Sequence, residues 1–233
     1  MYQGVHNVAA TPEIPRRLPR GTHGLDRRLV VASQHTRLLE AVGRAVAVKG
    51  YADTTIDDIV RGAGVSKKTF YEHFSDKEDC FVSAYEAAAE QLFERVREAQ
   101  LRDPDDDWLE RTRAGIVAYL RWLAAEPALA RVFLIEVGAA GPRAAESRER
   151  LRDRYAELIG RLQQEARADF PELPELPAQI FHAVVAAVDD IVVREIREGG
   201  AEDLLRLEPI LRYLQVALLA GPEVAARSAD LGQ

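Results

Sequence analysis

Residues 54–81 read TTIDDIVRGAGVSKKTFYEHFSDKEDCF and predict two short helices joined by a tight turn. Thr55 has the side chain of an N-cap, and Asp58 stands three residues on, at capping-box spacing. A glycine turn ends this helix near Gly62 or Gly64, and Ser66 can cap the next one. The stretch therefore predicts a helix-turn-helix.

The flanking sequence extends this unit on both sides. A helical period begins at about Ser33 and stops at Gly50, which gives a longer first helix. Ser75 and Glu78 have the spacing of a second capping box, so a long helix is expected to start there and run to about Leu101.

The second helix of a helix-turn-helix lies in the major groove of duplex DNA. The groove accepts donors and short polar side chains at its floor, and cations or hydroxyls toward the phosphates. Phe70 and Phe74 are expected to face inward, which leaves the polar residues outside. The expected DNA-binding residues are Thr55, Ser66, Lys67, Lys68, Thr69, Tyr71, His73 and Lys77.

Charge is distributed unevenly along the 233 residues, whose net charge is −7. Residues 1–77 hold 12 Lys and Arg against 8 Asp and Glu, whereas residues 78–233 hold 19 against 30. A basic N-terminal third on an acidic protein predicts a local contact with a polyanion. A merely solvated basic surface is the alternative interpretation.

Three regions are predicted along the chain. Residues 1–32 carry prolines, glycines and arginines without an apolar period, so a disordered basic arm is expected. Residues 33–77 form the helix-turn-helix domain, and residues 78–233 form a larger helical domain. No strand alternation competes, so the protein is expected to be all-α with about nine helices.

Several other classes of protein are disfavoured. No apolar run approaches the roughly 20 residues that span a bilayer, and no secretory signal is evident, so a cytoplasmic protein without a membrane partner is expected. His182, Asp189 and Asp190 share one predicted helix, where a solvated or interface role is favoured over a metal or catalytic site. Neither an enzyme nor a cofactor nor a bound metal is predicted.

The order of residues in the stretch resembles the DNA-binding domain of the TetR family of bacterial transcriptional regulators. The closest parts are Gly64-Val65-Ser66, Phe70-Tyr71, His73-Phe74 and Lys77-Glu78. The resemblance covers about residues 36–85 and implies an all-α homodimer with an N-terminal three-helix DNA-binding domain. It further implies a regulatory domain whose small ligand relieves repression.

Carried over by position, the resemblance assigns two kinds of DNA contact. Lys67, Lys68 and Thr69 would meet base edges. The residues that would meet the DNA backbone are Thr55, Tyr71, His73 and Lys77. Glu72 departs from the pattern, because a carboxylate on this helix repels phosphates. It either accepts from a cytosine amine or faces solvent, and solvent is the favoured interpretation.

Aromatic residues gather on the central helices, where members of this family often have a ligand pocket. Core packing is the alternative interpretation for each of them. Glu136, flanked by apolar residues, is partly exposed, paired with an arginine, or an anchor for the ligand. The pocket candidates are Tyr85, Trp108, Tyr119, Trp122, Phe133, Glu136 and Tyr155.

The last two long predicted helices are apolar over more than one face, so one face is available to a partner. By resemblance, these helices from two subunits form a four-helix dimer interface. The dimer candidates are Phe181, Val184, Val188, Ile191, Leu207, Leu211, Leu214 and Leu218.

Together these expectations describe a ligand-responsive repressor that binds a palindromic operator as a homodimer and is released by an unknown small-molecule effector. The long helix after Lys77 is expected to act as the lever between ligand and DNA. The alternatives are a helical redox sensor that uses Cys80, the single cysteine, or a protein-interaction module without an inducer.

Overall fold

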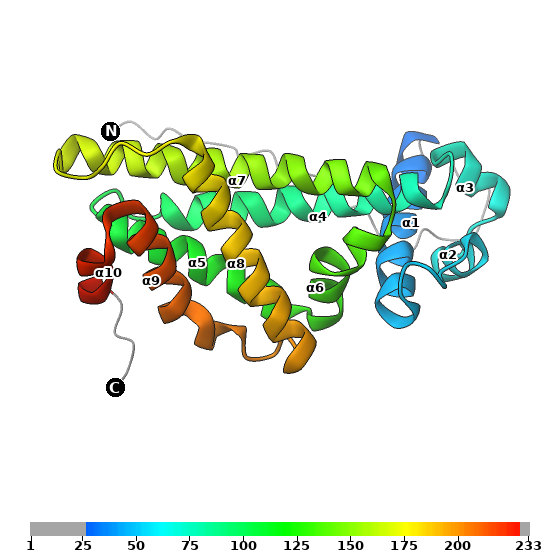
Figure 1. The fold of residues 1–233 in the computed structure, drawn as a ribbon. Helices are drawn as coiled ribbons and strands as arrows, with labels where there is room; N and C mark the ends of the chain where they lie inside the picture. Colours follow the sequence, from blue (N-terminus) through cyan, green and yellow to red (C-terminus); the bar gives the residue numbers. More distant parts are fainter. Residues whose placement is uncertain (1–26, 229–233) are drawn as a thin grey trace, which may run out of the picture.

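The structure, a computed structural model, describes residues 27–228, and every regular element in that part of the chain is helical (Figure 1). The N-terminal helices are α1 (Arg27–Lys49), α2 (Ile56–Ala63) and α3 (Lys67–His73). The helices that follow are α4 (Lys77–Gln100), α5 (Trp108–Ala125), α6 (Pro127–Leu134), α7 (Pro142–Asp169), α8 (Ala178–Glu198), α9 (Glu208–Ala220) and α10 (Pro222–Ser228). Two 3-10 helices are η1 (Glu136–Ala139) and η2 (Leu204–Leu207). The all-α prediction is confirmed.

The first helix begins earlier than predicted. It starts at Arg27 rather than at about Ser33, so residues 27–32 are helical and do not belong to an arm. The prolines and glycines of the N-terminal region end at Gly24, and nothing after it breaks a helix. Residues 1–26 of the expected arm lie outside the described residues.

The start of α4 differs from the predicted capping box by one residue. Asp76 is the N-cap, and its carboxylate accepts a hydrogen bond from the Asp79 N–H at 2.8 Å. Asp79 accepts in return from the Ser75 N–H, also at 2.8 Å. Glu78 is thereby left for a contact with another helix, described below.

Two further boundaries depend on proline and on tight backbone turns. Pro209 lies in the first turn of α9, where its missing N–H is not needed. The α6 helix ends at Leu134, and the chain then tightens into η1. Pro222 starts α10, which the sequence reading did not anticipate.

The long helices α4 and α7 lie side by side and form the spine of an elongated molecule (Figure 1). Helices α1–α3 occupy one end, whereas α9 and α10 lie at the other, with α8 crossing between the spine and the lower face. Helix α6 packs against α1 and brings the larger domain into contact with the N-terminal one.

One continuous apolar core runs from the N-terminal helices into the larger domain. Leu38 of α1, Phe70 of α3, Phe81 of α4 and Leu120 of α5 all belong to it and are essentially inaccessible to solvent. Interiors packed in this way transmit displacement between elements. The N-terminal helices are therefore mechanically connected to the rest of the molecule.

Candidate DNA-binding surface and internal cavity

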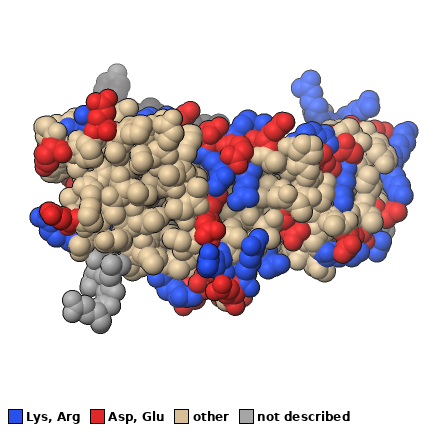
Figure 2. Space-filling view, viewed as in Figure 1, with Lys and Arg blue, Asp and Glu red and all other residues tan. Residues whose placement is uncertain are grey.

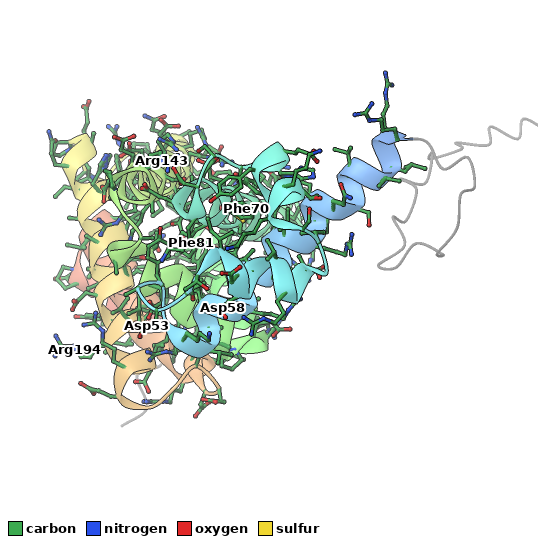
Figure 3. The ribbon with its side chains drawn as sticks, turned by 90° about the vertical axis from the view of Figure 1, so that its right-hand side faces the viewer. Asp53, Asp58, Phe70, Phe81, Arg143 and Arg194 are labelled. Carbon is green, nitrogen blue, oxygen red and sulfur yellow. The ribbon has the colours of Figure 1, made fainter. Side chains whose placement is uncertain are left out.

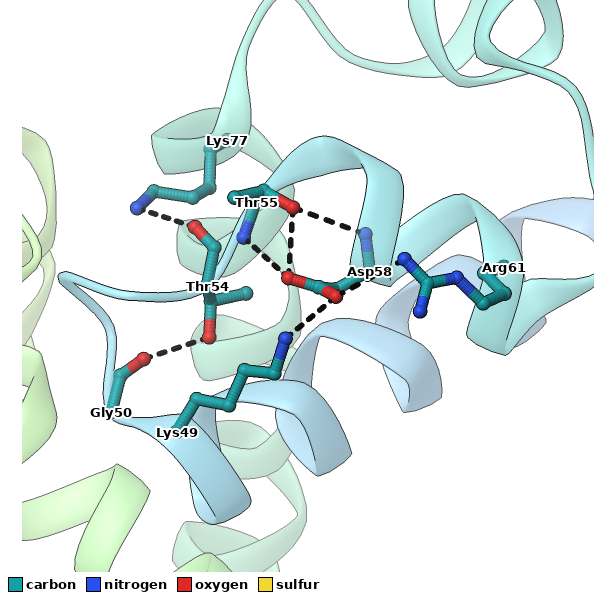
Figure 4. Close-up of polar contacts among 7 residues, drawn as sticks. All are labelled: Lys49, Gly50, Thr54, Thr55, Asp58, Arg61 and Lys77. Atoms are coloured by element: carbon teal, nitrogen blue, oxygen red, sulfur yellow. Dashed lines mark hydrogen bonds and ion pairs between the residues drawn. The ribbon is translucent and has the colours of Figure 1, made fainter.

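The α2–turn–α3 unit is held by local caps (Figure 4). Thr55 accepts a hydrogen bond from the Asp58 N–H, and the Asp58 carboxylate accepts from both the N–H and the hydroxyl of Thr55. Gly64 follows α2 with φ of 65°, a left-handed conformation that glycine adopts without strain. Ser66 then caps α3 by accepting from the Thr69 N–H at 3.0 Å. The predicted capping box at Thr55 is confirmed.

Asp58 is also an ion-pair hub between α1 and α2. Its Oδ1 lies 2.7 Å from Lys49 Nζ and 3.4 Å from an Arg61 guanidinium nitrogen (Figure 4). The Lys49 hydrogen bond, followed by those from Thr55, holds the pKa of Asp58 well below its usual range. The carboxylate thus fixes the start of α2 against the end of α1.

The α3 helix separates its faces as the sequence predicted. Phe70 and Phe74 are buried, whereas Lys68 and Tyr71 point outward, Tyr71 being 57% exposed. Lys67 is exposed too and forms a surface ion pair with Asp57 at 2.9 Å. Figure 3 views the molecule from this end, where Phe70 lies on α3. Cationic and hydroxyl groups are therefore presented on one surface.

Two of the expected DNA-binding residues have partners inside the protein. Lys77 Nζ donates to the carbonyl oxygens of Tyr51 and Thr54 at 2.7 and 2.9 Å, and it lies 4.1 Å from the centre of the Tyr51 ring. The His73 ring lies 5.6 Å from that of His35, and burial, together with His35, lowers the pKa of His73. The packing of α1 and α4 around these residues, which their spacing does not reveal, creates both contacts.

Glu136 is partly exposed, one of the three expected alternatives, and it does not line the cavity described below. Its Oε2 accepts a hydrogen bond from the Tyr51 N–H at 2.8 Å, so η1 of the larger domain holds the loop between α1 and α2. The reason is positional: η1 places this carboxylate beside Gly50, whose φ of 79° is a conformation that glycine adopts without strain.

A second connection joins the two domains through α7. Arg143 donates its backbone N–H to Glu78 at 2.8 Å, and its guanidinium pairs with Asp76 at 2.6 Å and with Glu78 at 3.1 Å. These carboxylates lie at the start of α4, directly after α3. The first turns of α4 and α7 are therefore fastened together.

The larger domain has a partly open cavity of about 90 Å³, lined mainly by α4, α5, α7 and α8 with contributions from α6 and α9. Four predicted pocket residues line it: Tyr85, Tyr119, Phe133 and Tyr155. Trp108 instead belongs to a separate apolar cluster with Leu162 and Val216. Trp122 packs edge-on against Phe133 and faces a surface groove rather than the cavity. Both tryptophans are thus corrected from pocket to packing residues.

The cavity also has charged residues that the sequence reading missed. Asp189 Oδ2 lies 3.4 Å from an Arg148 nitrogen and 3.3 Å from Arg152 Nε. Burial raises the pKa of Asp189 despite these two guanidinium groups. The arginines are one turn apart on α7, but the helix is so rich in charge that no pattern distinguishes them from solvent-facing residues.

The three acidic and histidine positions considered on α8 do not converge. His182 is exposed and lies 3.5 Å from Asp153, whereas Asp189 faces the cavity. Within residues 27–228, no group of three or more His, Cys, Asp or Glu side chains could hold a metal ion.

The dimer candidates divide into interior and surface positions. Val184, Leu207 and Leu211 are buried in the subunit's own core, and Val188 lines the cavity, which corrects these four. Phe181, Ile191 and Leu214 are partly exposed, and Leu218 is 38% exposed, close to Ile210 at 50%. Figure 2 shows a broad face without charged side chains over α9 and the first half of α8.

The fold and this surface define a helix-turn-helix protein with an attached helical domain. Residues 38–84 match the family model described as bacterial regulatory proteins, tetR family. Residues 38–84 therefore form a DNA-binding domain of the TetR type.

A curated relative is the HTH-type transcriptional regulator EthR of Mycolicibacterium smegmatis, 31% identical over 123 residues. The match covers 49% of this chain and 52% of the relative, so it spans about half the length of that protein.

Two solved structures share the fold. Fatty acid degradation regulator FadR from Bacillus halodurans has a TM-score of 0.70 at 20% identity, with 78% of this chain and 94% of that chain covered. FadR from Bacillus subtilis in complex with stearoyl-CoA has a TM-score of 0.65 at 19% identity, with 80% and 98% covered. None of the described helices is both long and apolar enough to cross a membrane.

Proposed function

We propose that this protein is a ligand-responsive transcriptional regulator that binds a palindromic operator in duplex DNA as a homodimer and is released by a small-molecule effector. The observation that carries the proposal is α3 itself. Its apolar side is locked into the core at Phe70, and its other side exposes Lys67, Lys68 and Tyr71. That is the arrangement a major groove requires.

The residues of α3 have complementary roles in this proposal. Lys67, Lys68 and Thr69 reach base edges, while Tyr71 and His73 contact the DNA backbone. The ion pair between Lys67 and Asp57 joins two exposed side chains, so little free energy opposes its exchange for a contact with DNA. Ser66 holds Thr69 in place through a 3.0 Å contact between their hydroxyls.

Thr55 and Lys77 approach DNA under constraint. The Thr55 hydroxyl already donates to Asp58. This end of α2 would therefore bind a phosphate through a backbone N–H of the first helical turn rather than through that hydroxyl. Lys77 already donates to two carbonyl oxygens. It would therefore attract the DNA phosphates mainly through its positive charge and not through a new hydrogen bond.

The dimer interface in this proposal is the uncharged face of α8 and α9. Its apolar residues still available to a partner are Phe181, Ile191, Ile210, Leu214 and Leu218. A twofold pairing of this face would place two α3 helices for successive major grooves, about 34–36 Å apart.

Ligand and DNA are coupled in this proposal through the start of α4. The cavity lies along α4, and the first turn of that helix holds Tyr51 through Lys77 and α7 through Glu78. Glu136 gives the larger domain a second hold on the same loop. A ligand that shifts α4 against α7 would therefore change the spacing of the two α3 helices.

No observation favours the redox alternative. Cys80 is 0% exposed, and burial raises the pKa of its thiol to about 12. Reactive cysteines are exposed and have a lowered pKa instead. The retained cations of α3 likewise count against a module that has lost DNA binding.

A gel shift on the DNA next to the gene tests the proposal. We expect two subunits per site and an affinity that falls steeply with salt. Lys68→Ala should weaken binding and alter sequence preference.

Leu218→Glu should yield monomers in sedimentation, whereas Leu101→Glu, at another exposed leucine, should not. A wild-type protein that is monomeric and ignores every duplex in dilute buffer would overturn the proposal.

A further inference from the structure

The cavity in the larger domain contains buried polar atoms that have no partner. The hydroxyls of Tyr119 and Tyr155, the Thr112 hydroxyl and the Arg152 Nε all lack a hydrogen bond among the described residues. The Arg152 Nε is 3.3 Å from Asp189 but is not oriented to donate to it. Buried polar groups are normally satisfied, because leaving one unpaired costs free energy.

These groups have one chemical property in common: each can donate a hydrogen bond. Burial, with Asp189 nearby, raises the pKa of Tyr119 and Tyr155, so both phenols keep their protons. Hydroxyls can accept as well as donate, whereas a guanidinium only donates, so a single partner able to bond all of these groups must be an acceptor.

The charges of the lining favour an anionic acceptor. Two guanidiniums, of Arg148 and Arg152, face the single carboxylate of Asp189. Their contacts with it, at 3.4 and 3.3 Å, are long for charge-assisted hydrogen bonds. Arg152 has a further partner in the exposed Glu149, but Arg148 and the tyrosines remain beside the cavity. A cation placed there would meet two like charges.

The rest of the lining is mostly apolar, so the remainder of the ligand is expected to be apolar as well. This part of the lining includes Val96, Ile116, Phe133, Leu158, Ile159 and Val185. A cavity of about 90 Å³ is smaller than the roughly 150 Å³ that accommodates benzene. A ligand with more than a few carbon atoms exceeds this volume, so it either extends through the opening of the cavity or displaces the surrounding helices, α4 and α7 among them.

We infer that the cavity binds an apolar molecule with a carboxylate head group, held by the guanidinium of Arg148 and the hydroxyls of Tyr119 and Tyr155. This inference rests on the proposed function, because it names the chemical class of the effector. It also gives α7 a direct role, since the residue that meets the head group lies on the helix that Arg143 fastens to α4.

Calorimetric titration of the full-length protein tests this with three probes of equal chain length: octanoate, methyl octanoate and octylamine. Octanoate should bind at least about tenfold more tightly than the ester or the amine. Its carboxylate meets two guanidinium groups, whereas the ester carries no charge and the ammonium group of the amine has only Asp189 as an opposite charge. Arg148→Gln should abolish the preference for octanoate. Arg150→Gln, on the same helix but paired with Glu86 at the surface, should leave it unchanged.

Tyr119→Phe is a second variant that distinguishes loss of ligand binding from loss of the fold. Because the Tyr119 hydroxyl has no partner, its removal should leave the melting temperature unchanged or raised while octanoate binding weakens. Equal binding of octanoate and octylamine, an unchanged preference in Arg148→Gln and Tyr119→Phe, or binding of none of the three probes would overturn the inference.

Gel shifts on the same preparations separate the two proposals. DNA binding that persists when no probe binds would defeat the ligand class alone. Tight octanoate binding that leaves DNA affinity unchanged would support the ligand class and defeat the effector role in the proposed function.

Discussion

Lys77 offers the sharpest test of how the N-terminal domain is held together. The sequence assigns this residue to a phosphate, whereas its ammonium group bonds the carbonyl oxygens of Tyr51 and Thr54 and lies over the Tyr51 ring. We therefore predict that Lys77→Met destabilises the fold as well as affecting DNA binding.

The magnitude follows from the contacts that are lost. A hydrogen bond from a charged donor contributes about 1.5–3 kcal/mol, and a cation–π contact adds about 0.5–1 kcal/mol. Lys77 is half-buried, so in the variant water can bond part of the exposed carbonyl groups. The free energy of unfolding is therefore expected to fall by about 2–3 kcal/mol. For a chain of this size, that lowers the melting temperature by roughly 5–10 °C.

The assay compares Lys77→Met with Lys68→Met by thermal melting and by DNA binding at several salt concentrations. Lys68 is exposed on α3, so its replacement should leave the melting temperature almost unchanged. A Lys77→Met protein that melts with the wild type, but whose salt slope falls by about 0.9, would refute the reasoning and make Lys77 a simple phosphate contact.

Three further predictions concern the same region. Gly64→Ala should cost about 1–2 kcal/mol in thermal or urea unfolding, because an alanine at φ of 65° is strained, and an unchanged midpoint would contradict this. Cys80 should react with a thiol reagent at pH 8 only after denaturation, because it is fully buried and its pKa is raised to about 12; rapid labelling of the native protein would argue otherwise. Asp58→Asn should destabilise the protein at neutral pH. Because the folded pKa of Asp58 is depressed, the wild type's advantage in urea midpoint should shrink as the pH falls below about 4, and an advantage that is independent of pH would disagree.

The helix-turn-helix was predictable because its determinants are local. Thr55, Gly64 and Ser66 act on backbone groups within four residues, so their spacing alone indicates where α2 and α3 begin and end. Phe70 and Phe74 could be assigned to the interior because a short helix has only two faces to choose between.

The same reasoning failed where a helix has several neighbours. Val184 and Leu211 were predicted to lie on a dimer face because both are apolar. Both are buried within the subunit instead, because α8 and α9 pack against other helices on more than one side. Trp108 and Trp122 were predicted to line a ligand pocket because they are aromatic, yet each packs outside the cavity. Periodicity shows that a residue is buried but not which partner buries it.

What the sequence by itself determined is the run of helices, the helix-turn-helix and the resemblance of its N-terminal helices to the TetR DNA-binding domain. The tertiary structure alone decided that Glu136 and Lys77 hold the loop at Tyr51 and that Arg148, Arg152 and Asp189 meet beside three tyrosines. The physical reason is range: caps and turns act between near neighbours in the chain, whereas these contacts join helices far apart in sequence. Only the packing of the helices brings them together.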